Sequence, residues 1–145
     1  MMTIKPEVTI YTDGACQDNP GPGGWAALLI YGQHTKTLFG GEKNTTNNRM
    51  ELRAALEALR ALDQPCQVTV YTDSEYLKKG ITEWMPSWKR RNWRRKGGEL
   101  ANVDLWMKLD EEITRHDIDW RWVRGHAGNV YNERVDQLAR RAIPK

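Results

Sequence analysis

Asp13 and Asp73 follow two segments of the chain that resemble each other, residues 8–12 and 68–72. Both segments are rich in β-branched and aromatic residues, a composition typical of β-strands. Each strand would therefore carry an aspartate at its carboxyl end. If the two strands lie parallel and adjacent, the aspartates meet at the edge of the sheet where open α/β folds place their sites.

Two carboxylates that lie a few ångströms apart repel each other, and one takes up a proton unless a cation lies between them. Glu51 and Asp136, on predicted helices, could reach the same edge. Ligands that are all oxygens select Mg²⁺ or Mn²⁺ over zinc, for which no cysteine and histidine spacing is present. Two such ions about 4 Å apart can activate a water and stabilise the leaving oxygen of a phosphodiester. The carboxylates thus predict a metal-dependent enzyme that cuts a nucleic-acid backbone.

Each carboxylate could also have a purely structural role rather than a catalytic one. An aspartate after a strand is often a turn residue, and a glutamate in the first turn of a helix often complements the helix dipole. Asp136 shares its predicted helix with Glu133 and Arg134, so it could be surface charge. Only the joint arrangement of the carboxylates favours a site.

A basic segment, residues 89–96, carries six positive charges and no negative one. Since the net charge of the chain is +3, removing these six leaves −3 on the remaining residues. Such a local patch indicates a polyanionic partner. A solvated charged loop is the alternative, but Trp84, Trp88 and Trp93 argue against it, because exposed indoles are costly without a partner or a packing role. Trp84 and Trp88 lie four residues apart and share one helical face, so they could also be core.

The length of 145 residues predicts a single domain, residues 1–145. Hydrophobic residues make up 39% and charged residues 28%, which is typical of a soluble globular protein. No apolar run is long enough to cross a bilayer, and residues 1–7 lack the core of a signal peptide, so we expect a cytoplasmic protein without membrane contact. Cys16 and Cys66 are expected to be reduced, with Cys66 in ordinary turn-and-core packing.

The hydrophobic pattern predicts an α/β fold with a mixed five-stranded sheet flanked by helices, from which the basic segment projects as a loop. The expected strands are residues 8–12, 25–31, 36–41, 68–72 and 119–123. The expected helices run from a cap at Asn47 or Asn48 to about residue 62, over 74–80, from about Thr82, from Asn102 or Val103 to 116, and over 132–142.

Seven motifs in order, between about residues 8 and 142, resemble bacterial type 1 ribonuclease H, the ribonuclease HI group. A single such motif would be weak, whereas seven in sequence order are very specific. They are Tyr-Thr-Asp-Gly-Ala at 11–15, Asn-Pro-Gly-Pro-Gly-Gly at 19–24, Thr-Thr-Asn-Asn-Arg-Met-Glu-Leu at 45–52, Tyr-Thr-Asp-Ser at 71–74, Asn-Val-Asp-Leu-Trp at 102–106, Gly-His-Ala-Gly at 125–128 and Asn-Glu-Arg-Val-Asp at 132–136.

The resemblance implies a ribonuclease H-like fold and a monomeric endonuclease that hydrolyses the RNA strand of RNA–DNA hybrids. It implies two-metal-ion catalysis with Mg²⁺, or Mn²⁺ as a substitute, leaving 3′-hydroxyl and 5′-phosphate ends. Four residues match the metal-binding carboxylates of the family: Asp13, Glu51, Asp73 and Asp136. His126, on a glycine-flanked loop, matches a mobile histidine that assists proton transfer or product release.

The resemblance also assigns residues to the nucleic acid. The basic segment matches a protruding handle, with Arg90, Arg91, Arg94 and Arg95 as its arginines. The remaining matches lie along the DNA strand (Tyr76, Trp84, Trp88), at a DNA phosphate (Thr46, Asn102) and along the minor groove (Cys16, Asn19, Asn48). Such contacts read shape and sugar chemistry rather than base sequence.

Glu75 departs from the family, whose members often carry an uncharged residue such as glutamine there. Its carboxylate would either turn outward or tune the affinity for metal. Two rival functions stay open. Another nuclease with the same carboxylate scheme, such as a DNA resolvase or a transposase core, is disfavoured by the handle and the minor-groove residues. A catalytically silent hybrid-binding module is disfavoured by the four carboxylates, because binding alone gains nothing from a cluster of like charges.

Overall fold

The computed structural model describes residues 4–94, 100–123 and 129–145. Its strands are β1 (Glu7–Cys16), β2 (Gly21–Tyr31), β3 (His34–Thr45), β4 (Gln67–Thr72) and β5 (Asp117–Trp122). Its helices are α1 (Asn47–Arg60), α2 (Glu75–Lys79), the π-helical turn η1 (Gly80–Trp84), α3 (Met85–Arg90), α4 (Val103–Arg115) and α5 (Val130–Arg141). Within these ranges, no helix combines the length and the apolar character that a membrane span requires.

The strands form one mixed sheet in the order β3-β2-β1-β4-β5, which confirms the predicted five-stranded architecture. β1 pairs antiparallel with β2 and parallel with β4, and β5 runs parallel to β4. In the parallel register Tyr11 pairs with Tyr71, so Asp13 and Asp73 each follow two residues beyond the same pair. The two similar segments of the sequence are therefore neighbours in space.

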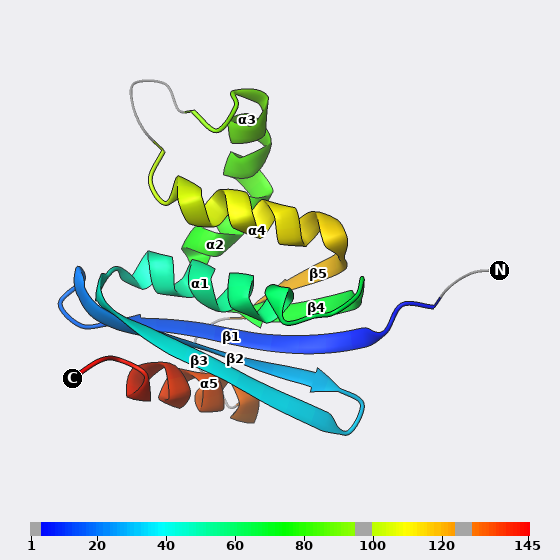
Figure 1. Ribbon diagram of the computed structural model, residues 1–145, viewed down its shortest axis with the longest axis horizontal. Helices are drawn as coiled ribbons and strands as arrows, with labels where there is room; N and C mark the ends of the chain where they lie inside the picture. The colour runs from blue at the N-terminus through cyan, green and yellow to red at the C-terminus, as the bar shows by residue number, and fades with distance from the viewer. Residues whose placement is uncertain (1–3, 95–99, 124–128) are drawn as a thin grey trace.

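The helices cover the sheet on both faces (Figure 1). α1 and α4 lie on one face, while α5 lies on the other, against β1 and β2. Leu52, Leu56 and Leu59, spaced to share one side of α1, are fully buried against the sheet. A smaller apolar cluster under α5 joins Tyr11, Ala26, Leu28, Val135 and Ala139. This sandwich fixes β1 between the two helices that carry Glu51 and Asp136.

Several boundaries differ from the prediction. β2 and β3 extend over 21–31 and 34–45, because their mutual pairing outweighs the low strand preference of the glycines at their ends. Thr46, rather than Asn47 or Asn48, caps α1, since its Oγ1 accepts a hydrogen bond from the Arg49 N–H at 3.2 Å. Cys66 is buried as predicted, and Cys16 and Cys66 are both free.

The segment between β4 and the basic residues is a helix interrupted by the π-helical turn η1. Gly80 opens this turn and is buried against Trp106 of α4. A Cβ atom at position 80 would lie only 1.9 Å from Cη2 of Trp106. The Trp106 ring also contacts Tyr76 and Trp88, each with ring centroids 5.5 Å away. This packing explains how a tryptophan-rich segment stays attached to the body of the fold.

Candidate metal and nucleic-acid site

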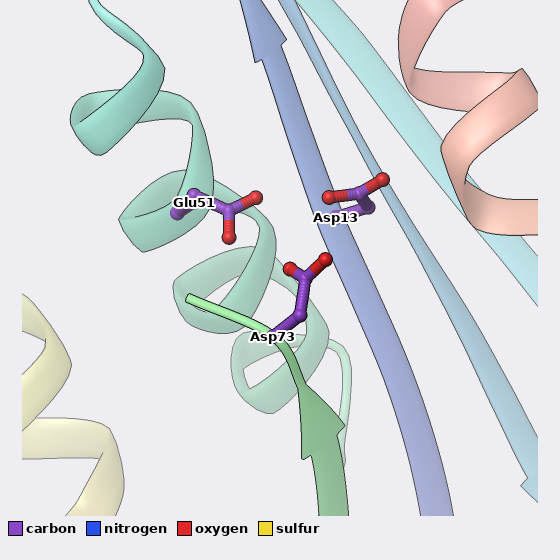
Figure 2. A group of neighbouring side chains, drawn as sticks. All are labelled: Asp13, Glu51 and Asp73. Carbon is purple, nitrogen blue, oxygen red and sulfur yellow. The ribbon is translucent and has the colours of Figure 1, made fainter. Parts of the chain in front are cut away.

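Asp13, Glu51 and Asp73 converge at one edge of the sheet. One carboxylate oxygen from each residue can be chosen such that all three lie within 4.8 Å of one another. Figure 2 shows their origins: Asp13 lies on β1, Glu51 on α1, and Asp73 directly after the end of β4. The parallel register of β1 and β4 brings the two aspartates together, and the first turns of α1 supply the glutamate. The predicted adjacency of the three carboxylates is thus present.

Gly14 lets α1 approach β1 this closely. A Cβ atom there would lie 2.6 Å from the backbone nitrogen of Glu51 and 2.8 Å from its Oε1, distances that real side chains do not adopt. The Gly14 N–H also donates a hydrogen bond to Asp13 Oδ1 at 2.9 Å. A larger residue at position 14 would push Glu51 away from the aspartates.

The carboxylates are buried close to one another, and this raises their pKa values. Asp13 is 7% exposed; burial and then the charge of Asp73 raise its pKa to about 7. Burial, followed by the charges of Asp13 and Asp73, raises the pKa of Glu51 well above its usual value. Without a cation the cluster therefore retains protons at neutral pH.

The environment of Glu51 Oε1 most directly tests whether this cluster fits a metal ion. Among residues 4–94, 100–123 and 129–145, this buried oxygen has no hydrogen-bond partner. A buried carboxylate oxygen without a donor is unfavourable unless it is protonated or binds a cation. Because every potential ligand is a carboxylate oxygen, the residues fit a hard divalent cation.

Asp136 of α5 lies at the same cleft, although it is outside the group of three just described. It contributes to the raised pKa of Asp13, and its Oδ1 lies 3.3 Å from Arg140 Nε. The cleft has a volume of about 380 Å³. Its walls are formed by Asp13, Gly14, Asn47, Asn48, Glu51, Asp73, Ser74, Glu75, Tyr76 and Asp136.

Four of these wall residues were not among the predicted site residues: Gly14, Asn47, Ser74 and Glu75. Each adjoins a predicted site residue in the sequence, and Gly14, Asn47 and Ser74 also lie inside the motifs that carry the family resemblance. Ser74 has a structural role as well, because its Oγ accepts a hydrogen bond from the Leu77 N–H and caps α2. Glu75 is exposed in the wall, so its charge adds to the negative field that an incoming phosphate meets.

Asn48 and Tyr76, both predicted to contact nucleic acid, line this cleft, and three more of the predicted residues lie beside it. Asn19 accepts a hydrogen bond from the Asn47 N–H at 2.9 Å, and the thiol of Cys16 lies 3.5 Å from the Thr45 carbonyl oxygen. These contacts place both residues beside the start of α1. Asn48 is exposed in the cleft wall, and Thr46 caps the same helix.

On the other side of the cleft, Tyr76, Trp84 and Trp88 line a second cavity of about 280 Å³, together with Leu100 and Ala101. Tyr76 therefore borders both the cleft and this aromatic cavity. The exposed arginines of the predicted handle that the structure describes are Arg90, Arg91 and Arg94. Arg95 and His126 lie outside the described residues.

Comparison with known proteins places this fold and cleft in one family. The profile of the RNase H family matches residues 5–144. The ribonuclease H of Hahella chejuensis is 63% identical over 133 residues, covering 91% of this chain and 90% of that protein. The ribonuclease H of Chromobacterium violaceum is 57% identical over 144 residues, covering 98% of each.

Among solved structures, LC9-RNase H1, described as a type 1 RNase H with the type 2 active-site motif, superposes with a TM-score of 0.89 at 36% identity. The superposition covers 99% of this chain and 74% of that one. The sheet order, the carboxylate cleft and these similarities agree with the resemblance noted in the sequence. The chain therefore belongs to the ribonuclease H family, in its bacterial type 1 group, whose members are endonucleases that hydrolyse the RNA strand of RNA–DNA hybrids.

Proposed function

We propose that this chain hydrolyses the RNA strand of RNA–DNA hybrids at the cleft between β1, α1 and β4, using two Mg²⁺ ions. The convergence of Asp13, Glu51 and Asp73 within 4.8 Å carries the proposal, because it creates a strongly anionic pocket of oxygen ligands. Mn²⁺, with the same ligand preference, is expected to substitute. We further propose that residues 1–145 form one domain that acts as a cytoplasmic monomer.

The chemistry is divided between the ions and the protein. Bound ions would activate the attacking water and stabilise the leaving oxygen, so that cleavage leaves 3′-hydroxyl and 5′-phosphate ends. Asp13, Glu51, Asp73 and Asp136 would hold the ions. Glu51 can also accept a hydrogen bond from a ribose 2′-hydroxyl, the group that distinguishes RNA from DNA. His126 would assist proton transfer or the release of product.

Recognition of the hybrid would use both sides of the cleft. Cys16, Asn19 and Asn48 would lie along the minor groove beside the RNA. A DNA phosphate would bind at Thr46 and Asn102, and the DNA strand would follow Tyr76, Trp84 and Trp88. The arginines of the handle, Arg90, Arg91, Arg94 and Arg95, would add attraction to phosphates that is independent of sequence and sensitive to salt.

The proposed activity predicts that only one of four labelled substrates is cleaved efficiently. With Mg²⁺ we expect cleavage of the RNA in an RNA–DNA hybrid, and no comparable cleavage of double-stranded RNA, double-stranded DNA or single-stranded RNA. EDTA should stop the reaction, and Mn²⁺ should restore it. Gel analysis of the end-labelled strands provides the measurement. Equal cutting of duplex DNA would favour the resolvase or transposase alternative, and binding of hybrid without cleavage would favour a silent binding module.

The pKa of Asp13 predicts how the stability of the metal-free protein changes with pH. In the unfolded chain Asp13 ionises near 3.8, whereas in the fold its pKa is about 7. Between these pH values only the unfolded state loses the proton, so the free energy of unfolding falls as the pH rises. The total fall between pH 4 and pH 7 should be about 2–4 kcal/mol. Mg²⁺ should restore stability at pH 8 and have little effect at pH 5, where Asp13 is protonated.

Thermal unfolding in EDTA and in Mg²⁺ tests this expectation. Because other groups titrate over the same range, the informative quantity is the difference in melting temperature between the wild-type protein and Asp13→Asn. In EDTA that difference should grow from pH 4 to pH 7 in favour of the variant. A difference that is independent of pH would mean that Asp13 ionises normally in the fold.

A further inference from the structure

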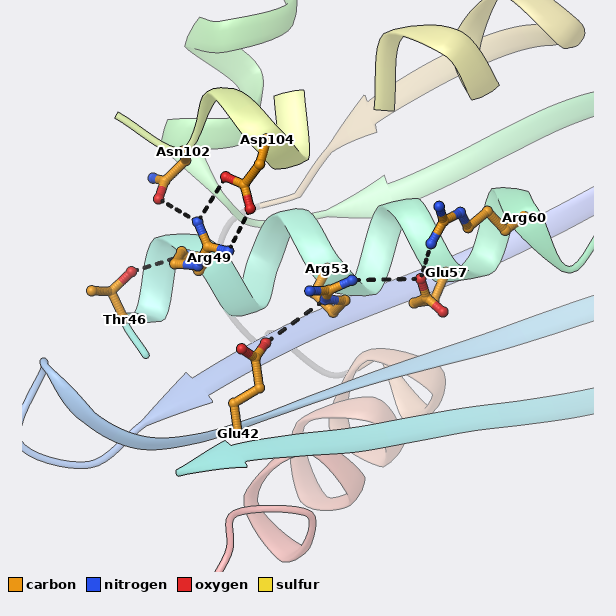
Figure 3. Close-up of polar contacts among 8 residues, drawn as sticks. All are labelled: Glu42, Thr46, Arg49, Arg53, Glu57, Arg60, Asn102 and Asp104. Carbon is orange, nitrogen blue, oxygen red and sulfur yellow. Dashed lines mark hydrogen bonds and ion pairs between the residues drawn. The ribbon is translucent and has the colours of Figure 1, made fainter. Parts of the chain in front are cut away.

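A network of polar contacts joins the first turns of α1 and α4 (Figure 3). Arg49 donates hydrogen bonds from Nη1 and Nη2 to the two carboxylate oxygens of Asp104, at 3.1 and 2.9 Å. This two-pronged contact fixes the plane of the guanidinium group. It also raises the pKa of Arg49 and lowers the pKa of Asp104. The Arg49 side chain thus has one defined direction.

Arg49 in turn determines how the amide of Asn102 is oriented. A guanidinium group has only donors, and its Nη1 donates a further hydrogen bond to Asn102 Oδ1 at 3.1 Å. The amide nitrogen must then face the other way, where it donates to the Tyr76 hydroxyl at 2.9 Å. Asn102 adopts a left-handed backbone conformation, with φ of 60°, at the N-cap position directly before α4. The side chain is therefore held at both ends.

The same network decides which hydrogen-bonding groups remain for a ligand. The Tyr76 oxygen accepts from Asn102 and also from Trp106 Nε1 at 3.1 Å, so its own O–H is left to donate. Thr46 Oγ1 accepts from the Arg49 N–H, which leaves its hydroxyl proton as a donor. Within the part of the chain that the structure describes, Asn102 keeps one unused amide N–H. The acceptor atoms of Thr46, Tyr76 and Asn102 are thus used within the network, and their remaining donor groups are available to a ligand.

We propose that Arg49 is a positioning residue, which together with Asp104 orients Asn102 and Tyr76 so that only donors face a DNA phosphate. Arg49 itself touches no substrate in this scheme. The inference rests on the proposed function, because the phosphate belongs to the hybrid expected at Thr46 and Asn102. Three donors beside the positive ends of α1 and α4 suit a phosphate oxygen, whereas a reversed Asn102 amide would present it with a carbonyl oxygen.

A purely structural role for Arg49 would lower stability without affecting any particular phosphate. The test therefore uses hybrids in which one DNA phosphate at a time is replaced by an uncharged methylphosphonate. For the wild-type protein we expect one position at which this change raises KM about tenfold, as for a lost charged hydrogen bond. In Arg49→Lys, which keeps the charge but loses the fork, KM for the unmodified hybrid should rise by a similar factor.

The decisive readout is the remaining sensitivity at that position. In Arg49→Lys the methylphosphonate should raise KM by less than about twofold, with kcat at saturating hybrid little changed. Arg53→Lys is the matched control. Arg53 lies one turn later on α1, has the same 25% side-chain exposure as Arg49, and pairs with Glu42 and Glu57 instead. It should keep the full wild-type sensitivity.

Asp104→Asn provides a second variant in case Arg49→Lys folds poorly. Asp104 has a 54% exposed side chain, and its substitution leaves Arg49 in place but less firmly held. We expect an intermediate loss of sensitivity. Full sensitivity in both variants would overturn the proposal, as would a wild-type enzyme that cleaves hybrids but responds to no single phosphate. A wild-type protein that cleaves no hybrid would instead overturn the proposed function.

Discussion

Asp13→Asn and Asp73→Asn are each expected to reduce the rate of hybrid cleavage by about a thousandfold or more while the protein stays folded. Each substitution replaces a charged metal ligand with a neutral amide of nearly the same shape. Because the three carboxylates repel one another in the absence of metal, each variant should also be more stable than the wild-type protein in EDTA. Single-turnover cleavage and thermal unfolding measure the two effects.

A matched control separates the loss of a ligand from the loss of a charge. Asp63 is exposed in the turn after α1, away from the cleft, so Asp63→Asn should leave both cleavage and metal-dependent stability unchanged. Titration with Mg²⁺, followed by the melting temperature, should show weaker stabilisation for Asp13→Asn and Asp73→Asn only. Near-normal cleavage by either variant would remove that residue from the metal site.

Gly80→Ala is expected to destabilise the protein by about 2 kcal/mol or more, although the change adds a single methyl group. The backbone at Gly80 has helical angles, φ −59° and ψ −47°, so alanine alone would favour the helix by about 1 kcal/mol. The loss must therefore come from the clash with Trp106, whose ring would lie 1.9 Å from the new carbon. Chemical denaturation provides the free energy of unfolding.

A double-mutant cycle identifies the cause. Trp106→Leu alone should be destabilising, because the indole is fully buried and donates a hydrogen bond to Tyr76. In the Trp106→Leu background, however, the added methyl group at position 80 meets no ring, so Gly80→Ala should cost much less. Equal costs in both backgrounds would contradict the close packing of Trp106 on Gly80.

The sheet and the carboxylates could be predicted because their signals are local and repeated. Residues 8–12 and 68–72 have strand composition and end in aspartate, and the parallel pairing of β1 with β4 then aligns Asp13 with Asp73. Apolar residues at helical spacing similarly predicted α1 and α4, which lie where expected within one or two residues at their starts. Site residues that lie at the ends of strands or helices can therefore be predicted from the sequence.

Features that depend on contacts between distant elements could not be predicted. The capping of α1 by Thr46 depends on where β3 ends, and the π-helical turn depends on how Gly80 meets Trp106. The orientation of Asn102 depends on Arg49, fifty-three residues earlier in the chain. No periodic pattern encodes such pairs, because each contact depends on how segments distant in the sequence are placed in the fold.

The parallel pairing of β1 with β4 also bears on when activity appears during folding. Residues 7–11 pair with residues 67–71, and both α1 and the β2–β3 hairpin intervene. Pairings between such distant segments form slowly, because a long loop must close before any contact compensates for the lost entropy. An incompletely folded chain would hold Asp13, Glu51 and Asp73 too far apart to share a metal ion. We therefore expect cleavage of RNA–DNA hybrids to emerge only with the native state, and folding intermediates to be inactive.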